Sequence, residues 1–75
     1  MLTNPKPFSI VQTMELYIEK IDAELERIGK SRHWLAIETG RSPQLVYYWL
    51  NTKSLRGAEP IARALKLHPK DLIRG

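Results

Sequence analysis

The first strong pattern in the chain is a run of large apolar residues over 9–28, spaced by three and four positions. At 100° per residue these side chains fall within about 120° of one another, which is typical of an amphipathic helix. The apolar stripe consists of Ile10, Val11, Met14, Tyr17, Ile18, Ile21, Leu25 and Ile28. Acidic residues cover the opposite face, which we interpret as solvated. We predict an extended first helix that ends at Gly29, with Ile10, Val11 and Met14 projecting beyond the domain.

Two shorter helices with a tight turn between them are predicted next, over 31–51. Ser31 is placed to cap the first of them, which we expect to run through Thr39. Gly40 follows, at a position where a left-handed backbone usually ends a helix. The second helix is expected to start from a Ser42 cap, with Pro43 at the first helical position. Such closely spaced helices form the helix-turn-helix pattern.

The second of these helices has two faces of different character. Leu45, Val46, Trp49 and Leu50 fall on one arc, and we predict that they face the core. The opposite arc carries Gln44, Tyr47, Tyr48 and Asn51 and no charge. A helix exposed only to water more often shows charged residues there. An uncharged face of amides and tyrosines therefore indicates a surface that contacts another molecule. Trp34 and Trp49 are interpreted as core residues.

The remainder of the chain predicts a loop over 52–57 and two further helices. One follows Gly57 and Pro60, with Ala58, Ile61, Ala62 and Leu65 facing inward. A last short helix after Pro69 is expected to close the core with Leu72 and Ile73. The expected fold is thus all-α, a compact bundle of about five helices without strands.

The stretch 31–51 resembles the helix-turn-helix of the phage Cro and repressor family, also called the xenobiotic-response-element family. The resemblance rests on an ordered set: Leu35-Ala36, Gly40, Ser42, Val46, Trp49-Leu50, Ile61-Ala62 and Ala64-Leu65. It covers roughly 21–73 and implies a lambda-repressor-like bundle in which Ala36 lets the two helices approach closely. It also implies a transcriptional regulator that binds double-stranded DNA as a homodimer. The chain departs from the family at Pro43, where a polar residue is usual, and at Asn51-Thr52, where glycine is common.

Length and composition restrict the other possibilities. Seventy-five residues form one domain, which we divide into an N-terminal arm (1–8) and a helical domain (9–75). There is no cysteine, and His33 and His68 have no spaced ligand partners, so we expect no metal or cofactor. No catalytic constellation is present, so we do not expect an enzyme. Without a membrane-spanning run or signal peptide, a cytoplasmic, bacterial or phage-encoded and nucleoid-associated protein is expected.

Positive charge is concentrated in one part of the chain. Residues 1–28 hold three Lys or Arg against five acidic residues, whereas 29–75 hold nine against three. Such an asymmetric field favours a polyanion as partner. The residues flanking the motif that we predict to contact DNA phosphates are Lys30, Arg32, Arg41, Thr52, Lys53, Ser54 and Arg56. We interpret the remaining cations near the C-terminus (Arg63, Lys66, Lys70 and Arg74) as solvated surface.

Base reading is assigned to the second motif helix. The candidates are Ser42, Gln44, Tyr47, Tyr48 and Asn51. Gln44 is the strongest, because an amide can pair with N6 and N7 of adenine together. We therefore predict a small Cro-like or repressor-like regulator that reads an inverted-repeat operator through the major groove. The alternative is a protein-binding module of the antitoxin type, in which the tyrosine face contacts another chain.

Overall fold

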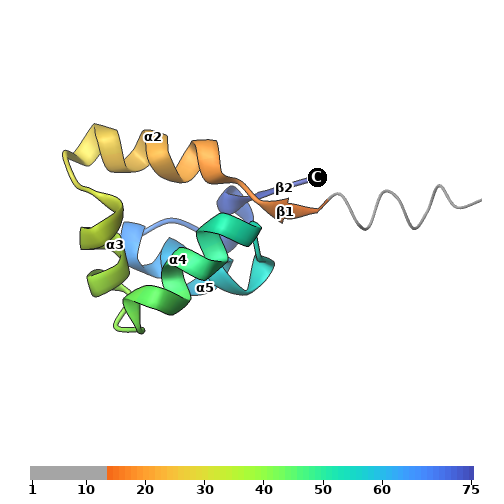
Figure 1. Ribbon diagram of the computed structural model, residues 1–75. Helices are drawn as coiled ribbons and strands as arrows, with labels where there is room; N and C mark the ends of the chain where they lie inside the picture. The colour runs from red at the N-terminus through yellow and green to blue at the C-terminus, as the bar shows by residue number, and fades with distance from the viewer. Residues whose placement is uncertain (1–13) are drawn as a thin grey trace, which may run out of the picture.

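Residues 14–75 are the part of the chain that this computed structural model describes, and they are mostly helical (Figure 1). The elements in order are β1 (Glu15–Leu16), α2 (Ile18–Ile28), α3 (Arg32–Glu38), α4 (Pro43–Thr52), the 3-10 helix η1 (Leu55–Gly57), α5 (Ala58–Leu65), the 3-10 helix η2 (Pro69–Leu72) and β2 (Ile73–Arg74). The predominance of helix is as predicted. The expected count differs, because the described residues hold four α-helices, two short 3-10 helices and a two-stranded sheet.

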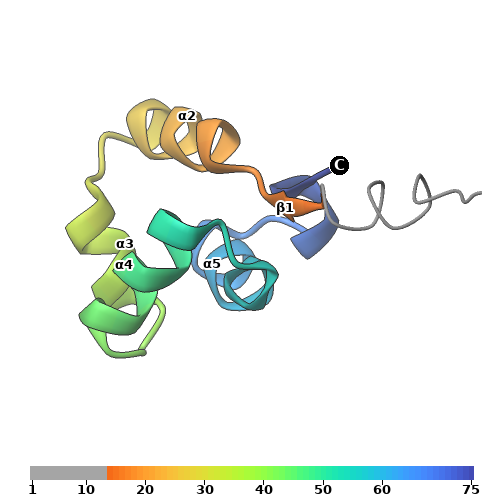
Figure 2. The same ribbon diagram turned by 45° about the vertical axis from the view of Figure 1, so that its right-hand side comes forward.

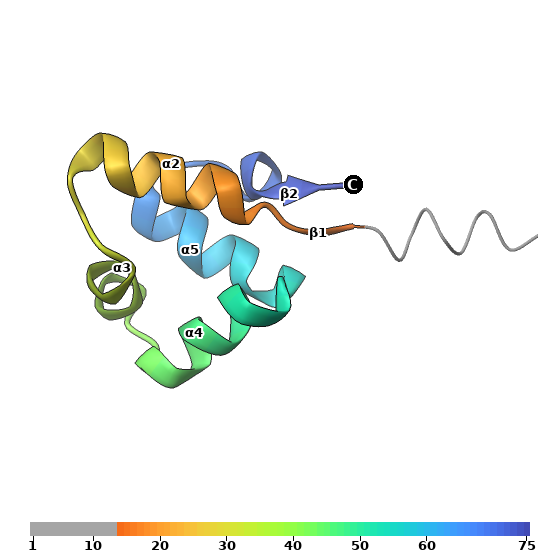
Figure 3. The same cartoon turned by 45° about the horizontal axis from the view of Figure 1, so that its top comes forward.

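The largest difference from the sequence prediction concerns the start of the first helix. Residues 9–13 of that prediction lie outside the described residues. Within them α2 begins only at Ile18, so the prediction of helix over 14–17 is wrong. Glu15 and Leu16 instead form β1, which pairs antiparallel with β2. β1 and β2 lie side by side at the end of the molecule opposite α3 (Figures 1 and 3).

Burial of Leu16 explains why this segment is extended. Leu16 is 0% exposed, whereas Met14, which the helical pattern placed on the apolar stripe, is 47% exposed. Successive side chains of a strand point to opposite faces, so in β1 Leu16 is directed into the core while its neighbour Glu15 is only half-buried. Tertiary hydrogen bonds hold this conformation, since the backbone N–H of Tyr17 donates to the carbonyl of Leu72 at 2.7 Å. Long-range pairing therefore overrides the local helical pattern.

The predicted helix ends agree with the structure at most positions. Gly29 (φ 71°) and Gly40 (φ 74°) both adopt left-handed backbone after a helix. The hydroxyl of Ser31 accepts a hydrogen bond from the N–H of Trp34 at 3.1 Å, which confirms the predicted cap of α3. Ser42 occupies the N-cap position of α4, but its side chain makes no capping hydrogen bond, so that cap is not formed. Pro43 does occupy the start of α4, as predicted.

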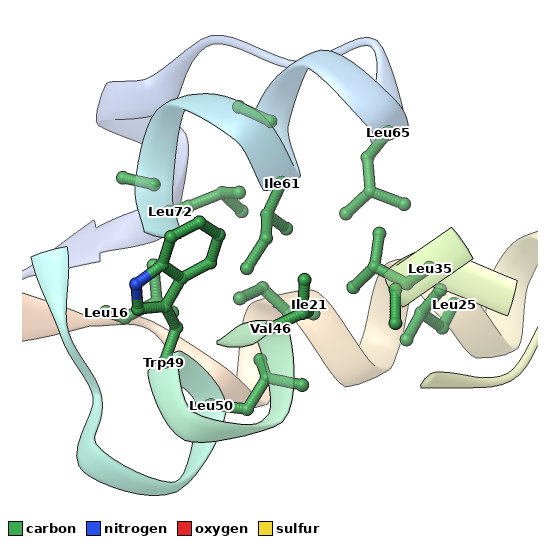
Figure 4. Packing of buried hydrophobic residues seen from close by; sticks show 13 residues of the cluster. Leu16, Ile21, Leu25, Leu35, Val46, Trp49, Leu50, Ile61, Leu65 and Leu72 are labelled. Atoms are coloured by element: carbon green, nitrogen blue, oxygen red, sulfur yellow. The ribbon is translucent and has the colours of Figure 1, made fainter. Parts of the chain in front are cut away.

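The core lies where all four α-helices meet the short sheet (Figures 2 and 4). In Figure 4 Val46 and Trp49 of α4 point toward Ile61 of α5, and Ile21 of α2 closes the same cluster. Its buried members are Leu16, Ile21, Leu25, Leu35, Ala36, Val46, Trp49, Leu50, Ala58, Ile61, Ala62, Leu65 and Leu72. Trp49 is thus a core residue, as predicted, while Trp34 is half-buried against the core. The inward assignment of Leu45 is wrong, because its side chain is 39% exposed.

The C-terminal segment closes the core differently from the prediction. Leu72 is fully buried, as expected, but it belongs to the 3-10 helix η2 rather than to an α-helix. Ile73 is half-buried and lies in β2, opposite Leu16. The last helix is therefore a single turn, and the chain then extends to pair with β1.

Candidate functional site

The exposed face of α4 is the candidate site, and its position follows from how α4 packs. Val46, Trp49 and Leu50 are buried, which turns the opposite side of the helix to solvent. Gln44, Tyr48 and Asn51 are exposed, and their spacing of four and three residues places them in one stripe along α4. Tyr48 is 60% exposed. This α4 stripe, defined by Gln44, Tyr48 and Asn51, carries no charge and offers two amides and a phenol as hydrogen-bonding groups.

Tyr47 lies apart from the α4 stripe. Its ring is half-buried and packs against the core, and its hydroxyl lies 3.5 Å from Nδ1 of His33 on α3. The distance is at the outer limit of a hydrogen bond. Tyr47 therefore connects α4 to α3, and its ring is less available than that of Tyr48. The sequence analysis placed Tyr47 and Tyr48 on the same outer face of the helix, whereas in the structure Tyr48 is exposed and Tyr47 is half-buried.

Two of the three polar candidates with hydroxyl groups next to α4 bond to the backbone. Thr52 Oγ1 donates to the carbonyl of Tyr48 at 2.8 Å, inside the last turn of the helix. Ser54 Oγ accepts a hydrogen bond from the N–H of Arg56 at 3.3 Å and so caps η1. Ser42 remains exposed, and its side chain makes no capping bond. Thr52 and Ser54 thus have a local structural role that the sequence assignment did not include.

Two of the predicted phosphate contacts already hold an acidic partner. Arg32 makes a bidentate ion pair with Asp22 of α2, with Nε–Oδ1 at 3.0 Å and Nη2–Oδ2 at 2.7 Å. Hydrogen bonding to Asp22 raises the pKa of Arg32, although desolvation opposes the shift. Lys53 Nζ lies 3.7 Å from a carboxylate oxygen of Glu15. These pairs lower the charge that Arg32 and Lys53 present to an approaching anion.

The remaining basic candidates are Lys30, Arg41 and Arg56. All three are exposed, and among residues 14–75 none of them forms an ion pair with an acidic side chain. Lys30 Nζ lies 5.5 Å from the centroid of the Trp34 ring, and the Arg41 guanidinium lies 6.0 Å from that of Trp49. Such contacts with an aromatic face orient a cation without neutralising it. These three side chains therefore carry the available positive charge of the candidate site.

Exposed side chains that the sequence analysis did not assign to a surface also belong to α3 and α4. Ile37 of α3 is 58% exposed, and Leu45 of α4 is 39% exposed. His33 and Ile37 are four residues apart, so they share one face of α3. A helical projection of α3 could have identified this face, since it lies opposite the buried Leu35 and Ala36. The surface therefore combines polar groups with isolated apolar side chains.

The groups exposed at this surface are hydrogen-bond donors and acceptors, cations and apolar side chains. Among the described residues no group of three or more His, Cys, Asp or Glu side chains is placed to hold a metal ion. None of the helices in the same range is long and apolar enough to cross a membrane. Comparison of the chain with protein-family models, curated proteins and solved structures found no match. The function of the protein is therefore inferred from the residues of the site itself.

Proposed function

We propose that this protein is a sequence-specific double-stranded DNA-binding regulator whose α3–α4 unit acts as a helix-turn-helix, with α4 entering the major groove. The observation that carries the proposal is the uncharged, exposed α4 stripe of Gln44, Tyr48 and Asn51, together with three exposed cations that form no ion pair within residues 14–75. Amide side chains read base edges through paired hydrogen bonds. Cations neutralise phosphates and fix the register of the protein on the duplex.

The three cations lie before, between and after the two helices of the α3–α4 unit. Lys30 precedes α3, Arg41 lies in the connection between α3 and α4, and Arg56 lies in η1 beyond the end of α4. In sequence they thus precede and follow both helices of the unit. We expect cations at such positions to contact the phosphate backbones on either side of a groove. The proposal includes a homodimer on an inverted repeat, because one such unit reads too few base pairs to select a unique genomic site.

The test is selection of bound sequences from a library of random duplexes, followed by affinity measurements by fluorescence anisotropy. A regulator of this kind should enrich a defined half-site, repeated in inverted orientation with centres about 10 base pairs apart. Affinity for the enriched duplex should exceed that for a scrambled duplex by at least about 10³-fold. Equal affinity for both duplexes, or no binding at low salt, would exclude the proposal.

A second candidate function is a protein-binding module of the antitoxin type. The exposed Ile37 and Leu45 favour it, because burying large apolar side chains against a partner chain is favourable. In this alternative the α4 stripe contacts a partner chain through Tyr48, an aromatic residue type enriched at interfaces. Double substitution of Ile37 and Leu45 by serine separates the two functions. It should leave DNA affinity unchanged in a regulator and abolish partner capture in an interaction module.

A further inference from the structure

A polar cavity of about 220 Å³ lies between the C-terminal end of α3 and the outer side of α5. None of the residues of the α4 stripe lines it. The lining residues are Glu38, Thr39, Arg41, Pro60, Arg63, Ala64 and Lys66. The cavity is therefore distinct from the surface proposed to read bases.

The side chains around this cavity give it a net positive charge. Arg41, Arg63 and Lys66 contribute three positive charges, and Glu38 contributes one negative charge. Arg63 also pairs with Glu59 at 3.0 Å, but both side chains are largely exposed, and such solvated pairs contribute little to stability. Arg63 can therefore turn to a ligand at little cost. Two guanidinium groups and an ammonium are the donors that most often bind phosphate in proteins.

The backbone of Lys66 allows its side chain to be tested separately from the fold. Lys66 is the C-cap of α5 and has a left-handed backbone (φ 61°), a position that glycine usually occupies. A residue with a side chain is strained in this conformation. Lys66 also lines the cavity, so replacing it with glycine removes one cation of the lining and relieves that strain at the same time.

We propose that this cavity binds a small phosphate monoester. The net charge of the lining is matched by the charge of about −1.5 to −2 that a phosphate monoester carries at pH 7. The volume of about 220 Å³ is below the roughly 300–1,000 Å³ of pockets for drug-sized ligands, so the ligand is a phosphate with a few carbon atoms. The Glu38 carboxylate at the rim can accept hydrogen bonds from its hydroxyl groups, whereas the Thr39 hydroxyl already donates to the carbonyl of Ala36 at 2.7 Å.

The first experiment is an NMR titration of the intact chain with glycerol 3-phosphate at constant ionic strength. Chemical shifts at Arg41, Arg63 and Lys66 should change and reach saturation. Glycerol and sodium chloride serve as controls for the carbon skeleton and for ionic strength, and neither should reproduce the effect. Changes that grow without saturation, or that centre on the α4 stripe, would overturn the proposal. Equal binding of acetate would also overturn it, because the site would then prefer carboxylates.

Two matched variants separate loss of the site from loss of the fold. Lys66→Gly removes the ammonium and relieves backbone strain, so the variant should melt at or above the temperature of the parent. Its affinity for glycerol 3-phosphate should fall at least tenfold. Lys53→Gly makes the same change at the other lysine with left-handed backbone (φ 55°), which does not line the cavity. The proposal is wrong if the two variants bind the ligand equally well.

Discussion

The backbone N–H of Leu16 donates a hydrogen bond to the carbonyl of Lys53 at 3.0 Å. Lys53 is the C-cap of α4, so β1 is attached directly to the end of the helix that carries the candidate site. The ion pair between Lys53 and Glu15 joins the same two segments. The short sheet therefore supports the position of α4 as well as closing the core.

Replacement of Leu16 tests this role of β1. Leu16→Ala should reduce the free energy of unfolding by about 2–5 kcal/mol, because it removes a fully buried side chain and leaves a cavity. Met14→Ala is the matched control, since Met14 is half-exposed beside β1 and its truncation should cost less than about 0.5 kcal/mol. Urea denaturation followed by tryptophan fluorescence gives both values. Similar losses in the two variants would mean that β1 contributes little to stability.

Features encoded by neighbouring residues were predictable from the sequence. The cap at Ser31, the left-handed glycines and the buried stripe of α4 each depend on side chains within a few positions of one another. The apolar periodicity also located the part of the first helix that the structure contains, with Ile21 and Leu25 buried as predicted. The exposed positions of Gln44, Tyr48 and Asn51 followed from the same helical geometry.

Features that depend on distant parts of the chain were not predictable in this way. β1 and β2 have two residues each and come from opposite ends of the described sequence. No local pattern of residues reveals that they pair. Leu45 is at the edge of the apolar arc, and whether it is buried depends on what packs beside it. The ion pair of Arg32 with Asp22 also joins two helices. The number of Lys and Arg residues in the sequence therefore overstated the positive charge that is free to contact a ligand.

The pair formed by Glu24 and Arg27 on α2 gives a pH-dependent prediction. A hydrogen bond from Arg27 is the main cause that lowers the pKa of Glu24 below its ordinary value of 4.5. A folded-state pKa below the unfolded one means that the pair stabilises the fold above the unfolded pKa. That contribution is lost as the pH falls from about 4.5 through the folded pKa. Arg27→Gln should raise the pKa of Glu24 in an NMR titration.

Arg63→Gln is the control for this titration. It removes an arginine that pairs with Glu59, so the pKa of Glu24 should stay at the value of the parent protein. If both substitutions shift Glu24 equally, the lowered pKa reflects the overall charge of the domain and not the contact with Arg27.

Release of Arg32 should strengthen electrostatic binding to DNA. With Lys30, Arg41 and Arg56 free, log affinity should fall with log salt at a slope of about −3 per subunit. Asp22→Asn frees Arg32 and should make the slope steeper by about one. Glu24→Gln is the matched control, because it removes an acid from the same helix that pairs with Lys20 and Arg27 instead. If both variants change the slope equally, net charge governs binding and Arg32 makes no specific contact.

Substitution of Gln44 distinguishes base reading from phosphate binding. Gln44 is exposed on the α4 stripe, so Gln44→Ala should leave the melting temperature unchanged. Loss of a bidentate contact to a base should weaken binding to the selected duplex by about 1–3 kcal/mol and leave binding to a scrambled duplex almost unchanged.

Arg56→Ala should behave differently, because phosphates are alike under every sequence. It should weaken binding to both duplexes and make the salt slope shallower by about one. Affinities of both variants on both duplexes at two salt concentrations provide the comparison. Equal losses on the two duplexes for Gln44→Ala, or no loss on either, would show that Gln44 does not read bases. Sequence selection would then have to come from Tyr48 or Asn51, which remain on the same exposed stripe of α4.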